Sequence, residues 1–307
     1  MPRIARIKPT GEPVVYHVMS RTALVGYPLN PVEKDFFVDL VKKLSKVYFV
    51  EILGYSIMGN HFHLLINMLP SGEFSDNEIE KRYKLRYGDQ KIISEGQIPF
   101  FRGKWSDISE FMKEVKSTFS RYYNKKHKRW GFFWGDRFKS VIVEKGTTLI
   151  NCLAYIDLNA VRAGIVDKPE EYRWCSLGYR VQTNNAGGFL SYNFGLEEFN
   201  VKGSDEKLKR YRKFVYEKWA SNEGAGTRID EKVIEKEKKN NFEVSKINRF
   251  KFKTRYFTDS GIIGSKEFVS KKYNQFKHVF LTKKEKIPKR VTGLDGIHSL
   301  KRLSEQI

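Results

Sequence analysis

Two histidines, His61 and His63, are separated by one residue in a segment that is predicted to be a β-strand. Because side chains alternate along a strand, both imidazoles point to one face while Phe62 turns to the other face, toward the core. Two imidazoles on one face can share a metal ion. The same pair can also be two polar residues of an ordinary sheet, and this short pattern does not separate the two interpretations.

A metal ion at this pair needs further ligands. The sequence contains no HExxH or CxxC pattern, which argues against a zinc hydrolase and against a zinc finger. Two imidazoles completed by amide, carboxylate, water or phosphate oxygens suit Mg²⁺ or Mn²⁺, and the nitrogen ligands favour Mn²⁺. Among polyanions, the natural reaction of such an ion is on a phosphodiester, whose charge it neutralises during in-line attack.

Tyr155 and Asn159 are four residues apart in a helix that is predicted over residues 149–163 and ends at Gly164. Both side chains then lie on one helix face, one turn apart, so that one could attack a phosphate while the other reaches a metal. A free phenol has a pKa near 10, but a divalent ion and nearby cations would favour its phenolate. Alternatively, Tyr155 is a core aromatic and Asn159 a helix-end residue, and the spacing does not decide.

The chain is strongly basic, with 57 Lys and Arg against 36 Asp and Glu and a formal net charge of +21. Such a charge creates a long-range field that attracts polyanions, so nucleic acid is the expected partner. The charge is uneven, because residues 201–307 carry a net +14 and residues 1–200 carry +7. Basic and aromatic side chains alternate over residues 121–134, which suits a DNA strand, although Trp130 to Trp134 could instead be core. The basic residues of this segment that we expect to contact DNA are Arg121, Lys125, Lys126 and Arg129.

Apolar periodicity predicts the elements that must hold these residues. The expected strands and helices are strands over residues 14–19, 48–58, 61–69 and 137–144 and helices over residues 31–46, 106–126 and 149–163. Asn30 is the predicted cap of the first helix, and Gly59-Asn60 predicts a hairpin that places His61 at its turn. Residues 70–104 are polar and are expected to be an excursion. This order predicts an α+β fold with a ferredoxin-like antiparallel sheet flanked by helices.

Beyond residue 200, the sequence predicts a helix over residues 205–220, a linker over residues 221–227 and a further helix after Ser265. We therefore expect a catalytic domain over residues 1–180 and a connecting helix and linker over residues 181–220. Residues 221–307 are expected to be a basic, mainly helical accessory region that binds DNA. The alternative for this region is a solvated charged tail.

Residues 155–164, Tyr-Ile-Asp-Leu-Asn-Ala-Val-Arg-Ala-Gly, resemble the tyrosine motif of the REP-associated tyrosine transposases, which are relatives of the IS200-like single-tyrosine transposases. Residues 59–65, Gly-Asn-His-Phe-His-Leu-Leu, resemble the HUH motif of that family. The order of the remaining matches also fits the family over roughly residues 10–180. These matches are His17 and Arg21, residues 131–140 and residues 171–176.

The resemblance implies that His61 and His63 bind the metal, that Tyr155 becomes linked to a 5′ phosphate while a 3′ hydroxyl is released, and that Asn159 assists at the metal. It also implies the HUH nuclease fold. The chain departs from the family at Ala160, where relatives commonly have proline, and at Asn159, which is one methylene shorter than the glutamine ligand of related transposases. The further basic residues in or beside the matched motifs that we expect to contact DNA are Arg21, Arg137, Lys139 and Arg162.

We therefore predict a metal-dependent single-stranded DNA endonuclease and strand transferase that acts near DNA hairpins through a 5′-phosphotyrosine intermediate. Two alternatives remain open: a non-catalytic ferredoxin-like protein that binds nucleic acid, and a metal-dependent phosphodiesterase that uses water. Tyr122 and Tyr123 are competing nucleophiles, but we assign them to packing and DNA contact, with Tyr122 on the apolar face of its helix. Single-stranded or hairpin DNA is the expected partner, and both a monomer and a homodimer remain open.

The remaining composition excludes other classes. No run of about 18 apolar residues could span a bilayer, and residues 1–6 lack a signal-peptide core, so we expect a cytoplasmic, nucleoid-associated protein without a membrane partner. Cys152 and Cys175 are too few for a disulfide framework, and we expect both to be reduced packing residues.

Overall fold

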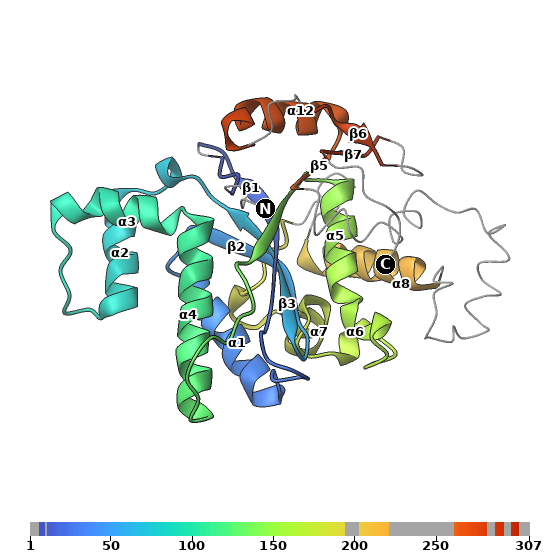
Figure 1. Cartoon of the computed structure of the whole chain (residues 1–307), viewed down its shortest axis with the longest axis horizontal. Coiled ribbons are helices and arrows are strands. Elements are labelled where there is room, and N and C mark those ends of the chain that lie inside the picture. The colour runs from blue at the N-terminus through green and yellow to red at the C-terminus, as the bar shows by residue number, and fades with distance from the viewer. Residues whose placement is uncertain are drawn as a thin grey trace.

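The structure is a computed structural model that describes residues 6–9, 11–193, 203–220, 261–280, 286–291 and 296–300. Its centre is a seven-stranded, mostly antiparallel sheet with helices on both faces (Figure 1). The predicted α+β class with a helix-flanked sheet is therefore confirmed. Among the described residues, none of the helices has the length and apolar character that a bilayer span requires.

The strands lie in the order β2-β3-β1-β4-β5-β7-β6, and β4 and β5 form the parallel pair. The strands are β1 (Val14–Arg21), β2 (Val50–Ile57), β3 (His61–Met68), β4 (Lys139–Val143), β5 (Ile262–Gly264), β6 (Lys289–Arg290) and β7 (His298–Ser299). The helices are α1 (Pro31–Ser45), α2 (Asp76–Tyr87), α3 (Ile98–Trp105), α4 (Ile108–Lys126), α5 (Thr147–Asp157), α6 (Asn159–Arg162), α7 (Ser176–Thr183), α8 (Ser204–Ala220) and α12 (Lys266–Gln275).

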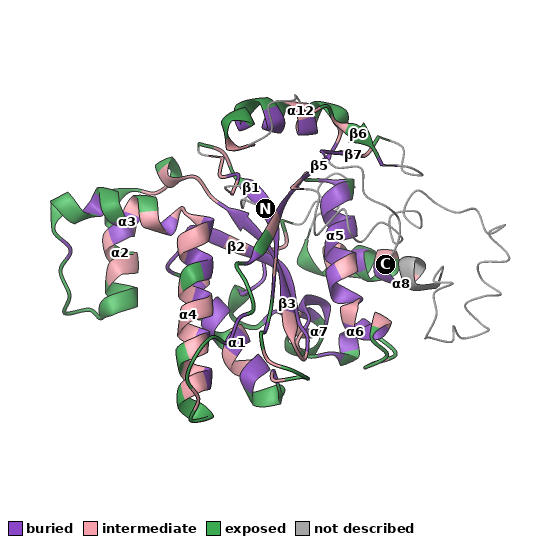
Figure 2. Ribbon diagram, in the orientation of Figure 1, coloured by how far each residue is buried: buried purple, intermediate pink, exposed green. Residues whose placement is uncertain are grey.

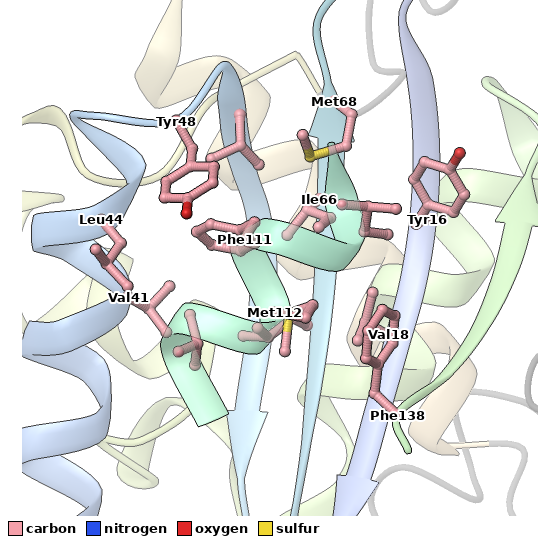
Figure 3. Close-up of a cluster of buried hydrophobic side chains, with 14 of the residues drawn as sticks. Tyr16, Val18, Val41, Leu44, Tyr48, Ile66, Met68, Phe111, Met112 and Phe138 are labelled. Atoms are coloured by element: carbon pink, nitrogen blue, oxygen red, sulfur yellow. The ribbon is translucent and has the colours of Figure 1, made fainter. Parts of the chain in front are cut away.

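One face of the sheet packs against α1 and α4 through a large apolar core (Figure 3). Val18 of β1 and Ile66 of β3 face Phe111 and Met112 of α4, and all four side chains are buried. Burying an apolar side chain of this size contributes about 1.5–3 kcal/mol, so this face supplies much of the stability of the fold. The predicted Asn30 cap of α1 is confirmed, because its side-chain oxygen accepts from the amides of Val32 and Glu33.

The other face of the sheet packs against α5. Val15 of β1, Leu65 of β3 and Leu153 of α5 belong to the second buried cluster. Gly54 of β2 makes this close approach possible, because a Cβ at this position would lie 2.1 Å from the Cδ1 atom of Leu153. Helix α5 therefore lies so close to the sheet that its side chains pack directly against the strands.

Three parts of the chain differ from the sequence predictions. The expected excursion over residues 70–104 contains two helices, α2 and α3, which extend from the body of the protein with exposed outer surfaces (Figure 2). The predicted helix over residues 149–163 is interrupted at Leu158, which has a ψ of 0° and separates α5 from α6. The positive φ of Gly164 agrees with the predicted end.

The C-terminal segment also differs from the expectation. Its described residues include α12, as predicted after Ser265, but they also add β5, β6 and β7 to the edge of the sheet next to β4. These strands have only two or three residues each, too few for a periodic signal. The predicted linker over residues 221–227 lies outside the described residues.

Candidate active site

Three histidines lie on the face of the sheet that α5 covers. His61 and His63 share this face with Leu65 of the same strand, whereas Phe62 packs into the α1–α4 core, as the alternation predicts. His17 of β1 joins them from the neighbouring strand, where it pairs with Leu65 in the antiparallel register. The two strands therefore display three imidazoles toward one helix.

The histidine rings are oriented by hydrogen bonds at Nδ1. His63 Nδ1 lies 2.9 Å from His17 Nε2, and the two rings are stacked with centroids 5.1 Å apart. His61 Nδ1 lies 2.7 Å from the side-chain oxygen of Asn60. Because an amide oxygen can only accept, His61 Nδ1 carries the proton and the Nε2 lone pair is left for another ligand. Metal-binding histidines commonly have this arrangement, in which the second ring nitrogen is held by a neighbour.

Both histidines of the pair are held in the neutral form. Burial, with the charges of His17, His61 and Arg162 adding to it, keeps the pKa of His63 well below its ordinary value. Burial and the nearby charge of Arg21 lower the pKa of His61 to about 4. Neutral imidazole is the form that can bind a metal ion, so burial keeps both rings in the protonation state that a ligand would need.

Tyr155 of α5 lies beside His17 and His63. Its ring meets His63 edge-on, with centroids 5.8 Å apart, and His17 in the same way at 6.0 Å. The Tyr155 side chain is partly exposed at the margin of the α5 cluster. The structure thus brings the predicted nucleophile beside His63, one of the predicted metal ligands, although 92 positions of sequence separate the two residues.

Arg162 of α6 folds back onto Tyr155. The guanidinium carbon lies 4.2 Å from the centre of the Tyr155 ring, and Nη2 donates to the Tyr155 carbonyl oxygen and to the Asn159 Oδ1 atom, each at 2.6 Å. Burial lowers the pKa of this guanidinium, and the charge of Tyr155 opposes that change. The interruption at Leu158 lies between these two residues and separates α6 from α5. The charges of Arg162 and Tyr155 interact, so the guanidinium favours the ionised form of the phenol.

Asn159 has a different environment from the one that its spacing predicts. Its Oδ1 atom accepts from Arg162, and its buried Nδ2 atom has no hydrogen-bond partner. A carbonyl oxygen has two lone pairs, so the bond to Arg162 leaves one lone pair for a metal. The atoms of the predicted ligands that could serve as donors to a metal are thus the Nε2 atoms of His61 and His63 and one lone pair of Asn159 Oδ1. Within the described part of the chain, no group of three His, Cys, Asp or Glu side chains is arranged to hold a metal ion.

Asp157 anchors the end of α5. Its buried carboxylate accepts from Ser176 Oγ at 2.5 Å, from the Leu177 amide at 2.9 Å and from Tyr211 Oη of α8 at 2.6 Å. Burial raises the pKa of this carboxyl, and the hydrogen bonds from Ser176 and Tyr211 oppose that change. Asp157 has no role among the sequence predictions, although an acidic residue within an otherwise apolar helix is a signal that could have identified it.

The predicted DNA-binding residues are distributed unevenly around this centre. Arg21 pairs with His61 in the β1–β3 register, and its exposed side chain lies at the site together with Arg162. Lys126 is exposed but bonds to the buried carboxylate of Glu33 at 2.7 Å, which ties it to α1. The remaining predicted residues lie on α4, on the loop after it or at the start of β4, and they are Arg121, Lys125, Arg129, Arg137 and Lys139.

The competing tyrosines are held in the α4 layer. Tyr122 is partly exposed and stacks on Phe36 of α1 at 3.6 Å. Tyr122 therefore packs on the apolar side of α4, as predicted, although Tyr123 is buried more deeply, against Phe133. Helix periodicity places the two neighbours only about 100° apart, so both rings can reach the core. Both cysteines are free and buried, as expected.

Comparison with known proteins adds little. No protein-family model matches the chain, and no curated protein matches it. The chain is similar to a solved structure described as the REP-associated tyrosine transposase bound to a REP hairpin, with 14% sequence identity and a TM-score of 0.42. The match covers 75% of this chain and 99% of that chain. A likeness of this size does not assign a function, so the chemistry must follow from the residues of the chain itself.

Proposed function

We propose that this protein is a metal-dependent enzyme that nicks and rejoins single-stranded DNA through a covalent link to Tyr155. The observation that carries the proposal is the position of the Tyr155 ring, edge-on to the stacked His17–His63 pair and beneath the Arg162 guanidinium. The resemblance of both short motifs to a family of DNA-hairpin transposases supports the same reaction class. The net charge of +21 supports a polyanionic substrate.

The first step is attack by Tyr155 Oη on a backbone phosphorus. The Oη–P bond forms while the P–O3′ bond breaks, and the phenol loses its proton as the departing 3′ oxygen gains one. Arg162 stabilises the developing charge on the phenol oxygen, and Arg21 attracts the phosphate. A Mg²⁺ or Mn²⁺ ion held by His61 and His63, with Asn159 as a further ligand, would neutralise the charge on the phosphate oxygens during attack.

The products of this step allow the same site to rejoin DNA. The 5′ phosphate stays on Tyr155, and the free strand carries a 3′ hydroxyl. Attack by a 3′ hydroxyl on the phosphotyrosine reverses the bond changes, restores the phenol and joins two strands. Because the phosphodiester energy is kept in the Tyr155 link, no external energy source is needed.

A covalent-capture experiment tests this proposal. Hairpin oligonucleotides with randomised single-stranded flanks are incubated with the protein and Mn²⁺, and the products are separated on a denaturing gel. We expect a protein–DNA adduct that EDTA prevents. Cleaved DNA without an adduct would instead indicate a phosphodiesterase that uses water. Binding that is indifferent to EDTA, with no cleavage, would indicate a nucleic-acid-binding module.

A further inference from the structure

Three surface segments meet beside Asn60 and His61. These are the loop between β1 and α1 (residues 22–30), the β2–β3 turn (residues 58–60) and the loop between α4 and β4 (residues 127–138). The backbone hydrogen bonds that join them run from Ala23 to Phe133 (2.8 Å), from Gly135 to Arg21 (3.0 Å), from Thr22 to Asn60 (2.9 Å) and from Leu29 to Gly59 (2.8 Å). The segments are therefore fixed to one another and to the strand that carries the histidines.

Aromatic residues in these segments divide into two groups. Phe133 and Trp134 are buried in the α1–α4 core. Trp130 and Phe132 are 89% and 88% exposed, and Tyr27 is 80% exposed. We refer to Tyr27, Trp130 and Phe132 as the aromatic platform. Rings of this size normally bury most of their surface, so three nearly bare rings on bonded neighbouring segments indicate a surface that binds a partner.

Tyr27 connects the platform to β3, the strand that carries His61 and His63. Its ring lies directly on Gly59, where a Cβ would approach the Tyr27 ring to 2.6 Å. Gly59 precedes Asn60, the residue that holds the His61 ring through Nδ1. Tyr27 of the platform and the strand of His61 and His63 therefore meet at one hairpin turn.

The charge around the platform identifies the class of partner. Loop 127–138 contains Lys128, Arg129 and Arg137 against one acidic residue, Asp136, and loop 22–30 contains no charged residue. A partner protein with an apolar surface would gain nothing from these positive charges. Cations beside flat exposed rings match a DNA strand whose phosphates are anionic and whose bases are unpaired, because stacked base pairs leave no base face open to a ring.

We propose that the aromatic platform binds unpaired bases of the strand that passes through the Tyr155 site. The position of these bases next to the cleaved phosphate depends on the proposed function, whereas the stacking itself does not. Arg21 connects the two regions, because its carbonyl accepts from Gly135 of the α4–β4 loop while its strand position pairs with His61. A DNA strand bound at His61 would therefore lie next to Arg21 and to the α4–β4 loop, which carries Trp130 and Phe132.

The test measures DNA binding without cleavage. Full-length Tyr155→Phe protein in EDTA is titrated into a labelled single strand of about 20 nucleotides, longer than the ~4–16 nucleotides that such surfaces cover. We expect Trp130→Ala with Phe132→Ala to weaken single-strand binding about 10- to 100-fold, since each stacked base accounts for roughly 10-fold. Trp130→Phe should retain most of the affinity. Phe100→Ala, which removes a 65% exposed ring on α3, is the matched control and should change nothing.

Two further measurements distinguish base stacking from binding through charge alone. The dependence of affinity on salt should keep its slope in the double variant, because no cation is removed. Binding to the corresponding duplex should change less than about two-fold. Unchanged single-strand affinity, or equal losses for single strand and duplex, would overturn the proposal. If the double variant lost binding to anionic lipid vesicles but kept its affinity for single-stranded DNA, that result would also overturn the proposal. Because these assays need no cleavage, their outcome is independent of whether Tyr155 forms an adduct.

Discussion

The two halves of the candidate site are held in place by different kinds of structure. His17 and His63 project from adjacent strands of a continuous antiparallel ladder that pairs all eight residues of β1 with β3. Tyr155 projects from the last turn of α5, where a few polar contacts through Asp157 and Arg162 fix the end of the helix. The strand half is thus set by the backbone of the sheet, and the helix half by side chains from distant parts of the chain.

This difference has consequences for substitutions. A ladder of backbone hydrogen bonds does not depend on any one side chain, so replacing a histidine removes chemistry and leaves the fold. The buried carboxylate of Asp157 accepts hydrogen bonds from several donors, and removing it leaves these donors without an acceptor, which destabilises the fold. Substitutions in the strand half should therefore lower activity alone, and substitutions in the helix half should lower both activity and the free energy of unfolding.

The largest expected effect is on the strand half. His61→Ala removes a candidate metal ligand, and we expect the rate of covalent-adduct formation to fall about 10²- to 10³-fold, since metal stabilisation of the transition state is worth several kcal/mol. The unfolding free energy should change by less than about 1 kcal/mol. His278→Ala, at an exposed position beyond α12, is the matched control and should be silent in both assays. A large loss of stability in His61→Ala would remove the contrast between the two halves.

The next effect concerns the link between Tyr155 and α6. Arg162→Met keeps the length of the side chain but loses the charge and both hydrogen bonds, so we expect adduct formation to slow about 10- to 100-fold through misplacement of the phenol. The rate of Arg162→Lys should lie between those of the parent protein and Arg162→Met, because an ammonium keeps the charge but lacks the planar guanidinium that donates two hydrogen bonds. Single-turnover rates at saturating DNA give the measurement. Arg210→Met on the surface of α8 provides the control, and equal rates in all three variants would show that Arg162 does not act on Tyr155.

The smallest expected effect is at the anchor of α5. Asp157→Asn removes the charge and one of the two acceptor oxygens, and it should lower the unfolding free energy by about 1 kcal/mol, measured by urea denaturation. Tyr211→Phe should cost less, and the double variant should cost less than the sum of the two, because both changes disrupt one hydrogen bond. Additive losses would mean that Asp157 and Tyr211 act separately, and α8 would then have no role in fixing the tyrosine helix.

The sequence predicted the strand half of the site better than the helix half. Alternation placed His61 and His63 on one face, and this follows from local geometry alone. The contact of His17 with His63 depends on the β1–β3 register, which no local pattern contains. Arg162 lies beyond an interruption at Leu158, where periodicity predicted a continuous helix, and its bonds to Tyr155 and Asn159 have no signal in the spacing.

Long-range and weakly patterned features could not be predicted. The bond between Asp157 and Tyr211 joins residues 54 positions apart, and neither residue type identifies the other. Helix α2 buries only Ile79, so its sequence lacks the apolar stripe that identifies a helix. The strands β5, β6 and β7 are too short for an alternation, and only β5 pairs directly with the open edge of β4.

The identity of the residue that carries the DNA tests the proposed chemistry most directly. DNA covalently captured in the presence of Mn²⁺ is trimmed, the protein is digested, and the modified peptide is sequenced by mass spectrometry. We predict that the phosphate lies on Tyr155, that Tyr155→Phe forms no adduct, and that Tyr122→Phe and Tyr123→Phe form it as the parent does. An adduct on any other residue, or one that persists in Tyr155→Phe, would contradict the proposed role of Tyr155.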